Sequence, residues 1–128
     1  MGIRRSAIRQ VAGVVMKVPE KGCLLRVFVG ESDVVGGRPL YEVIVLKARE
    51  LHLAGATVLR GMMGFGANSR MHTAKVLRLS EDLPIVIEIV DRAERIESLM
   101  PFLDEMIAEG MITKELVDVV MYRANRGA

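Results

Sequence analysis

The chain has 128 residues, of which 51% are hydrophobic and 27% charged, and its 18 Lys and Arg residues against 16 Asp and Glu residues give a net charge of +2. This composition favours one compact folded domain and excludes an intrinsically disordered chain. The single cysteine, Cys23, excludes an intrachain disulfide framework and a multi-cysteine metal site, and it indicates a reducing, cytoplasmic setting. No apolar run reaches the length of about 18 residues that a membrane span needs.

Residues 1–22 form a basic extension. They carry five basic residues against Glu20 alone, a net charge of +4, which leaves −2 for residues 23–128. We interpret the extension as a tail, or a helix resting on the domain formed by residues 23–128, and expect residues 1–15 to be dispensable for folding, with Met16 as an alternative start. Because the domain is mildly acidic and has few aromatic residues, we predict no nucleic-acid partner for it. For the basic extension, the alternative interpretation is an arm that contacts a membrane or RNA.

A strand and a helix are predicted for the first half of the domain. Leu24–Val29 is a short run of apolar and β-branched residues, which is typical of a strand. A turn-rich stretch with the pair Gly36-Gly37 follows, and Pro39 favours the first turn of a helix that ends near Gly55. The apolar stripe of this helix comprises Leu40, Val43, Ile44, Ala48 and Leu51.

Three more strands are predicted in the second half of the domain. They are Ala56–Met63, Leu83–Val90 and Leu116–Tyr122, and the first of them is followed by a glycine-containing polar loop, Gly64–His72.

A second helix precedes the last strand. Asp91 with Glu94 three residues later resembles a capping box, so the helix is expected to start there and to run to Gly110, with a kink at Pro101. Its buried stripe is predicted to comprise Ala93, Ile96, Met100, Leu103 and Ile107.

The order strand, helix, strand, strand, helix, strand predicts an α+β, ferredoxin-like βαββαβ fold, a four-stranded antiparallel sheet with both helices on one face. The residues expected on the other face are Val86, Glu88 and Val90 with Asp118, Val120 and Tyr122. This set is too apolar for a surface exposed to water, so we predict an oligomer built by packing sheet faces or edges together. The alternative is that the last strand lies beside the N-terminal segment.

The most informative segment is the glycine-rich stretch Arg60–Gly66. Gly61, Gly64 and Gly66 fall within six residues, where a strand leaves the sheet and the backbone must turn sharply or approach another group closely. Exposed amides there would form a site for an anion such as phosphate, together with the side chains of Arg60, Arg70 and His72. The alternative is a long hairpin whose glycines serve only its turns.

No catalytic or metal-binding constellation is visible, so we predict that the protein is not an enzyme and requires no cofactor. His52 is interpreted as a surface residue at a helix end, and Cys23 as inert packing in a buried strand. Glu88 is a carboxylate within an apolar strand. For Glu88 we favour an ion pair with an arginine across an interface over acid–base chemistry.

Several motifs together resemble the nitrogen-regulatory PII signal proteins. Gly64-Phe65-Gly66, His72-Thr73, Leu83-Pro84 and Ile87-Glu88-Ile89-Val90 are similar to the stretch around the PII T-loop. The resemblance is closer to a family of PII-like proteins catalogued as a domain of unknown function. The motifs assigned to that family are Val29-Gly30-Glu31, Ala54-Gly55-Ala56-Thr57-Val58, Arg60-Gly61, Met63-Gly64-Phe65-Gly66 and Leu83-Pro84, within residues 23–123.

The resemblance implies a ferredoxin-like trimer that binds an adenine nucleotide (AMP, ADP or ATP) or a related signal in clefts between subunits and reports its occupancy through a loop. By position, Gly64, Phe65 and Gly66 would form the loop base, Arg70, His72 and Thr73 would lie on the loop, Glu88 would line the cleft, and Arg123 would stand near the phosphate-contacting arginines of PII proteins.

Departures from the PII pattern widen the range of ligands that the site could bind. Ile85 and Ile87 occupy positions where PII proteins have lysines, and Gly110–Glu115 replaces the turn that wraps the phosphates, so a monophosphate or another small ligand fits at least as well as a triphosphate. Relatives are often encoded beside fluoride-export channels, which implies a membrane transporter or channel as a partner besides the homotrimer itself. The alternative function is a structural or metal-tolerance trimer of the CutA type that binds no nucleotide.

Overall fold

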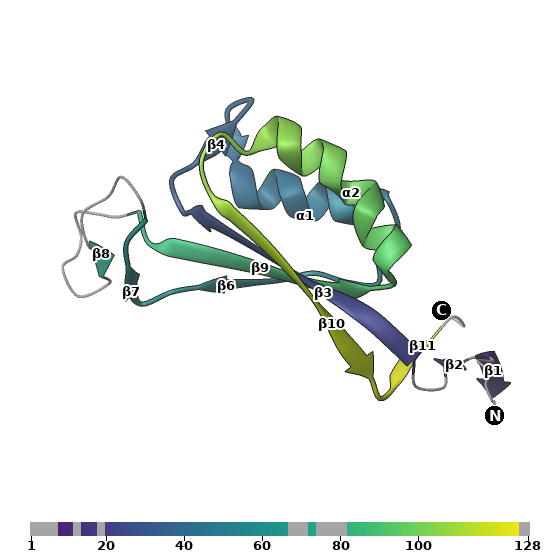
Figure 1. The fold of residues 1–128 in the computed structure, drawn as a ribbon. Helices are drawn as coiled ribbons and strands as arrows, with labels where there is room; N and C mark the ends of the chain where they lie inside the picture. Colours follow the sequence, from purple (N-terminus) through teal and green to yellow (C-terminus); the bar gives the residue numbers. More distant parts are fainter. Residues whose placement is uncertain (1–7, 12–13, 18–19, 67–71, 74–81, 126–128) are drawn as a thin grey trace. The chain divides into compact units, whose positions relative to one another are not determined.

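The computed structural model describes residues 8–11, 14–17, 20–66, 72–73 and 82–125. The chain divides into two compact units, one formed by Met1–Gly22 with Leu116–Ala128 and the other by Cys23–Glu115. The larger unit holds both helices and the greater part of a four-stranded sheet (Figure 1).

The four-stranded sheet is antiparallel and has the strand order β10-β3-β9-β6. The strand bounds are Met111–Val119 for β10, Glu20–Gly30 for β3, Pro84–Asp91 for β9 and Thr57–Arg60 for β6. The helices α1 (Leu40–Glu50) and α2 (Ala93–Met106) both cover one face of this sheet (Figure 1). The predicted α+β, ferredoxin-like fold is therefore confirmed.

The hydrophobic core lies between this sheet and the two helices. β3 and β9 pair from Cys23 opposite Asp91 to Gly30 opposite Pro84, and alternate residues of both strands face the helices. The buried strand residues are Cys23, Leu25, Val27, Val29, Ile85, Ile87 and Ile89, and the helices contribute Leu40, Ile44, Ala48, Ile96, Leu99 and Leu103.

The opposite side of the sheet, which we call the open face, carries the intervening residues. From β3, β9, β6 and β10 these are Leu24, Arg26, Phe28, Val86, Glu88, Val90, Thr57, Leu59 and Glu115. None of them is fully buried. The open face is thus the mixed apolar and charged surface that the strand alternation predicts.

Helix α1 begins where the sequence indicated and ends earlier. Pro39 directly precedes its first residue, and the predicted stripe is buried at Leu40, Ile44 and Ala48. The helix ends at Glu50 because His52 adopts a φ of 62°, a left-handed conformation that terminates helices and is usually left to glycine. The predicted end near Gly55 is therefore too late.

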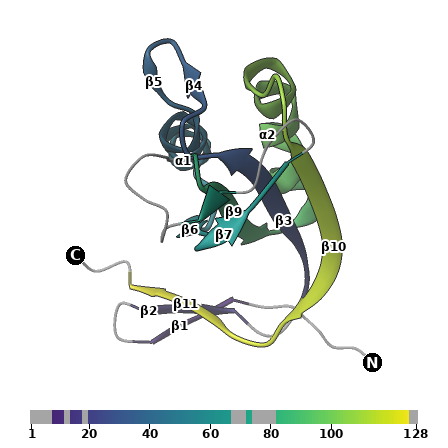
Figure 2. The same ribbon diagram turned by 90° about the vertical axis from the view of Figure 1, so that its left-hand side faces the viewer.

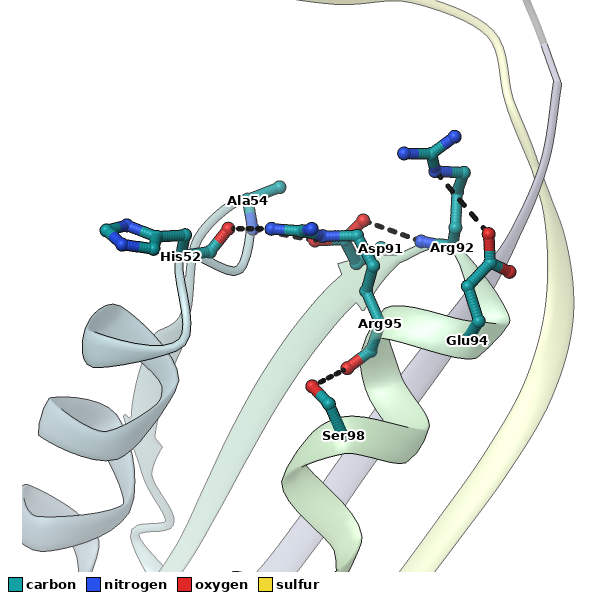
Figure 3. A network of polar contacts seen from close by, with 7 residues as sticks. All are labelled: His52, Ala54, Asp91, Arg92, Glu94, Arg95 and Ser98. Carbon is teal, nitrogen blue, oxygen red and sulfur yellow. Dashed lines mark hydrogen bonds and ion pairs between the residues drawn. The ribbon is translucent and has the colours of Figure 1, made fainter.

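The capping box predicted at Asp91 is wrong, because this carboxylate serves other partners. Asp91 accepts hydrogen bonds from the N–H groups of Arg92 at 2.7 Å and Ala54 at 2.9 Å, and lies 3.5 Å from Nε of Arg95 (Figure 3). Arg95 in turn donates from Nη2 to the carbonyl oxygen of His52 at 2.5 Å. Asp91 thereby joins the end of β9 to the loop after α1 and to the start of α2.

The buried stripe of α2 agrees only in part with the prediction, since Met100 and Ile107 are partly buried. Ile96 and Leu103 are buried as expected, Leu99 is buried in addition, and Ala93 is exposed. Pro101 lies inside the helix, which ends at Met106, so the predicted end at Gly110 is too late.

A short hairpin precedes α1. Its strands are β4 (Val34–Val35) and β5 (Arg38–Pro39), and Figure 2 shows the hairpin projecting beyond the start of α1. Gly36 and Gly37 form the two-residue turn with φ of 59° and 80°. Two successive positive φ values are typical of the tight hairpin turns that match strand twist, and they explain the glycine pair.

The last strand of the main sheet begins earlier than predicted. β10 covers Met111–Val119 and not Leu116–Tyr122, so Val120 lies beyond its end and Tyr122 belongs to another strand. A Cβ at Gly110 would lie 2.6 Å from the carbonyl oxygen of Phe28 on β3. The glycine therefore lets the chain approach β3 closely just before β10 begins.

The smaller unit contains a three-stranded antiparallel sheet in the order β1-β2-β11. Its strands are Ile8–Val11, Val14–Lys17 and Tyr122–Asn125. The expectation of a tail or a helix is therefore wrong for these N-terminal residues, because they form strands and β11 pairs with β2. The alternative, in which the last predicted strand lies beside them, applies only to Tyr122, because residues 116–119 belong to β10 of the main sheet. The dispensability of residues 1–15 stays a prediction.

Candidate functional site

The candidate ligand site is the base of the loop between β7 (Met63–Gly64) and β8 (His72–Thr73). The two strands pair antiparallel, with Met63 opposite Thr73 and Gly64 opposite His72. The backbone thus brings three predicted site residues together at the loop base. Arg70 lies outside the described residues.

Gly61 and Gly64 allow the loop base to approach β9. A Cβ at Gly61 would lie 2.8 Å from Cγ of Pro84, and one at Gly64 would lie 2.9 Å from the same atom. The N–H of Gly61 also donates to the carbonyl oxygen of Pro84 at 2.8 Å. Neither glycine has a positive φ, so both are explained by close approach and not by a turn conformation.

Arg60 lies next to this contact and is held by a carboxylate. Its Nη1 atom is 3.4 Å from Oε2 of Glu31, and the two side chains are 57% and 30% exposed. The N–H of Glu31 donates to the carbonyl oxygen of Leu83 at 2.8 Å, which fixes Glu31 beside the start of β9. Glu31 was not predicted as a site residue, although the shared motif Val29-Gly30-Glu31 contained the signal that could have found it.

The apolar side chains of the loop base are exposed. Met62 is 76% exposed, Met63 55% and Phe65 72%. Three large apolar side chains exposed within four residues indicate a surface that contacts a ligand or a partner. Phe65 and the neighbouring Gly66 therefore remain candidate site residues.

Glu88 lies on the open face and not at the loop base. The Nε atom of Arg26 donates a hydrogen bond to Oε2 of Glu88 at 2.9 Å, and this hydrogen bond raises the pKa of the Arg26 guanidinium. The two residues are register partners on β3 and β9. The expectation that Glu88 pairs with an arginine across an interface is therefore wrong, because its partner lies in the same chain.

Arg123 belongs to the smaller unit. It lies on β11 opposite Met16 of β2, and its side chain is exposed. The loop-base residues belong to the other compact unit, Cys23–Glu115.

Metal-binding groups and membrane-spanning helices are both absent from the described part of the chain. Within it, no three or more His, Cys, Asp and Glu side chains gather in a group that could hold a metal ion. Neither helix found there has the length and apolar character needed to cross a membrane.

The strand order, the two helices on one face and the loop that follows β6 define a PII-like, ferredoxin-like fold. The chain is similar to the structure of CPII, a nitrogen regulatory PII-like protein from Thiomonas intermedia K12, bound to ADP, AMP and bicarbonate. The TM-score is 0.59 and the sequence identity 15%, with 80% of this chain and 91% of CPII covered. A second CPII structure, bound to ADP and bicarbonate, gives a TM-score of 0.52 at 17% identity, with the same coverage.

The chain belongs to the family DUF190, described as "Uncharacterized ACR, COG1993", which it matches over residues 22–119. A UPF0166 protein of Aquifex aeolicus (strain VF5) is 37% identical over 107 residues, which cover 82% of this chain and 98% of the relative. A UPF0166 protein of Methanocaldococcus jannaschii is 33% identical over 87 residues, covering 68% and 80%. The resemblance to a PII-like family is therefore confirmed.

Proposed function

We propose that the protein is a regulatory protein of the PII-like class that binds a small ligand, an adenine nucleotide, at the base of the β7–β8 loop and reports its occupancy through residues 64–73. The observation that carries this proposal is the close packing of Gly61 and Gly64 on Pro84. This packing holds the loop base against the start of β9, beside an arginine and an exposed aromatic ring.

Each part of the loop base suits a part of a nucleotide. The Arg60 guanidinium can form charge-assisted hydrogen bonds with a phosphate, and the exposed ring of Phe65 offers a flat apolar surface to a base. The structures of CPII with ADP and AMP show that a protein of the same fold binds such ligands.

The proposed assembly is a homotrimer, with ligand clefts between neighbouring subunits and the open faces turned inward. Its support is the open face itself, where Leu24, Phe28, Leu59 and Val90 stay accessible in the single chain. The transporter or channel partner, the cytoplasmic setting and the absence of catalysis stay predictions.

Calorimetry with AMP, ADP and ATP tests the ligand site. Arg60→Ala should weaken binding about tenfold or more, because it removes a charge-assisted hydrogen bond. Arg49→Ala is the matched control, since Arg49 is an exposed arginine on α1. Glu31→Gln should tighten binding, because the Glu31 carboxylate competes with a phosphate for Arg60.

Two outcomes would contradict the proposal. Equal affinities of wild type and Arg60→Ala would move the site away from the loop base. No heat from any of the three nucleotides at millimolar concentration would favour the structural or metal-tolerance assembly of the CutA type.

A further inference from the structure

The two compact units differ in the sign of their net charge. The smaller unit contains seven basic residues against Glu20 and Asp118, a net charge of +5, which leaves −3 for Cys23–Glu115. The seven basic residues are Arg4, Arg5, Arg9, Lys17, Lys21, Arg123 and Arg126. A charge asymmetry of this kind within one chain indicates that the basic part contacts a polyanionic partner.

The positive charge extends into the strands of the smaller unit. β1, β2 and β11 together contain Arg9, Lys17 and Arg123 and no Asp or Glu, so the three-stranded sheet has a net charge of +3. Of the two acidic residues of the unit, Asp118 already has a partner, because its Oδ1 atom lies 2.7 Å from Nζ of Lys21. The sheet itself is therefore a basic surface.

The strand register places two arginines on one face of this sheet. Arg9 of β1 and Arg123 of β11 both lie opposite Met16 of the central strand β2. Directly opposed residues share a face, so each outer strand contributes one cation to the same row. We call this side the arginine face, and its next row comprises Val11, Val14 and Asn125.

Exposed apolar side chains directly precede Arg123 in the chain. Val120 is 73% exposed and Met121 59%, and the two residues connect the end of β10 to Tyr122, the first residue of β11. A contact made by charge alone has no use for them. Basic residues next to exposed apolar side chains are typical of surfaces that insert between lipid headgroups.

An anionic lipid bilayer fits these features better than RNA does. Single-stranded RNA is bound by aromatic side chains that stack on its bases, and Tyr122 is the only aromatic residue of β1, β2 and β11. Nucleic-acid interfaces are also polar, which would leave Val120 and Met121 without a contact. A bilayer offers a negative surface to the arginines and an apolar layer beneath the headgroups.

We propose that the smaller unit binds the surface of an anionic lipid bilayer. Arg9 and Arg123 contact the lipid headgroups, and Val120 and Met121 insert between them. This role is separate from the ligand site proposed at the loop base. It gives a function to the basic extension and to β11, which the proposed function leaves unused.

Binding of the full chain to lipid vesicles tests the role of the arginines. The protein should co-sediment with vesicles of phosphatidylcholine and phosphatidylserine but not with phosphatidylcholine alone, and added salt should weaken the binding. Arg9→Gln and Arg123→Gln should each weaken it about fivefold, the effect of one basic residue at an anionic surface, and the double variant about 25-fold. Arg49→Gln is the matched control, because Arg49 is an exposed arginine of the larger unit.

A second pair of variants tests the insertion of apolar side chains. Replacing Val120 and Met121 together by Ser should weaken vesicle binding and leave its salt dependence unchanged, whereas the arginine variants should reduce the salt dependence. Val34→Ser is the matched control, since Val34 of β4 is 66% exposed in the larger unit. Equal effects of the apolar variant and this control would contradict insertion.

Three outcomes would overturn the lipid assignment as a whole. They are no binding to phosphatidylserine vesicles at low salt, equal binding to neutral vesicles, and unchanged affinity in the double arginine variant. A gel-shift experiment with a single-stranded RNA oligonucleotide at the same salt concentration adds a fourth. If RNA binds more tightly than the vesicles and the double arginine variant loses that binding, the arginine face is an RNA surface and the proposal is wrong.

Discussion

The two faces of β9 differ in what covers them. Ile85, Ile87 and Ile89 are at most 2% exposed because α1 and α2 pack on them, whereas Val90 on the open face is 38% exposed in the single chain. Both sets belong to one strand and consist mainly of β-branched residues, so strand propensity does not distinguish them. The helix-covered face therefore holds the subunit together, while the open face is available for contact with another molecule.

The largest expected effect comes from the helix-covered face. Ile87→Ala should lower the free energy of unfolding by about 2–5 kcal/mol, because it removes buried methyl groups and leaves a cavity. Val86→Ala, one residue along on the open face, should cost much less. Denaturant unfolding of both variants makes the comparison, and equal losses would show that the two faces do not divide their roles as described.

A charge on the open face should break the assembly and spare the fold. Val90→Asp would bury an unpaired carboxylate between copies at a cost of several kcal/mol, so the oligomer should dissociate while the circular dichroism spectrum stays unchanged. Leu46→Asp is the matched control, since Leu46 is 40% exposed on α1. Light scattering decides, and dissociation of both variants or of neither would contradict the role of the open face.

At the Pro84 end of β9, close packing and the candidate ligand site coincide. Gly64→Ala should destabilise the fold by about 1–3 kcal/mol, since its Cβ would overlap the Pro84 ring, and should also weaken nucleotide binding. Gly55→Ala has no heavy atom within 4 Å of its Cβ and should change neither property appreciably. A Gly64→Ala variant with wild-type stability would remove the argument for close approach.

The smallest effect is expected for an ion pair on the helix side of β10. Lys114 bonds to Glu97 of α2, and this hydrogen bond raises the pKa of the lysine above its ordinary value of 10.5. A lysine whose pKa is higher in the folded state than in the unfolded state adds to the free energy of unfolding. This contribution is complete at pH values below the pKa of the unfolded state and is lost as the pH rises through the pKa of the folded state. Lys114→Gln should therefore leave Tm nearly unchanged at neutral pH and make it less sensitive to pH above about 10.5. An unchanged pH dependence would contradict this contribution.

Much of the fold could be predicted because local patterns and tertiary packing agree. The alternation of Ile85, Ile87 and Ile89 and the spacing of Leu40, Ile44 and Ala48 match the faces that the structure buries. β10 was misplaced because it is an edge strand whose first half carries polar residues such as Lys114 and Glu115.

The partners of the site residues could not be predicted, because they are distant in sequence. The glycines at 61 and 64 indicated a close approach, but nothing local identifies Pro84 as the group approached. Asp91 has the local pattern of a helix cap, and its actual partner Ala54, 37 residues away, leaves no signal in that local pattern. Glu88 was correctly expected to bind an arginine, although its register with Arg26 depends on the whole sheet.

The pairing of β3 with β9 also determines how the chain must fold. Arg26 and Glu88 are 62 residues apart, so the central pair of the sheet forms only after a long loop containing α1 and β6 has closed. Such non-local pairing slows folding, to about milliseconds or longer for domains of mixed topology. Nascent chains would therefore expose both apolar faces of β9 during this interval, and dilute conditions should favour refolding over aggregation.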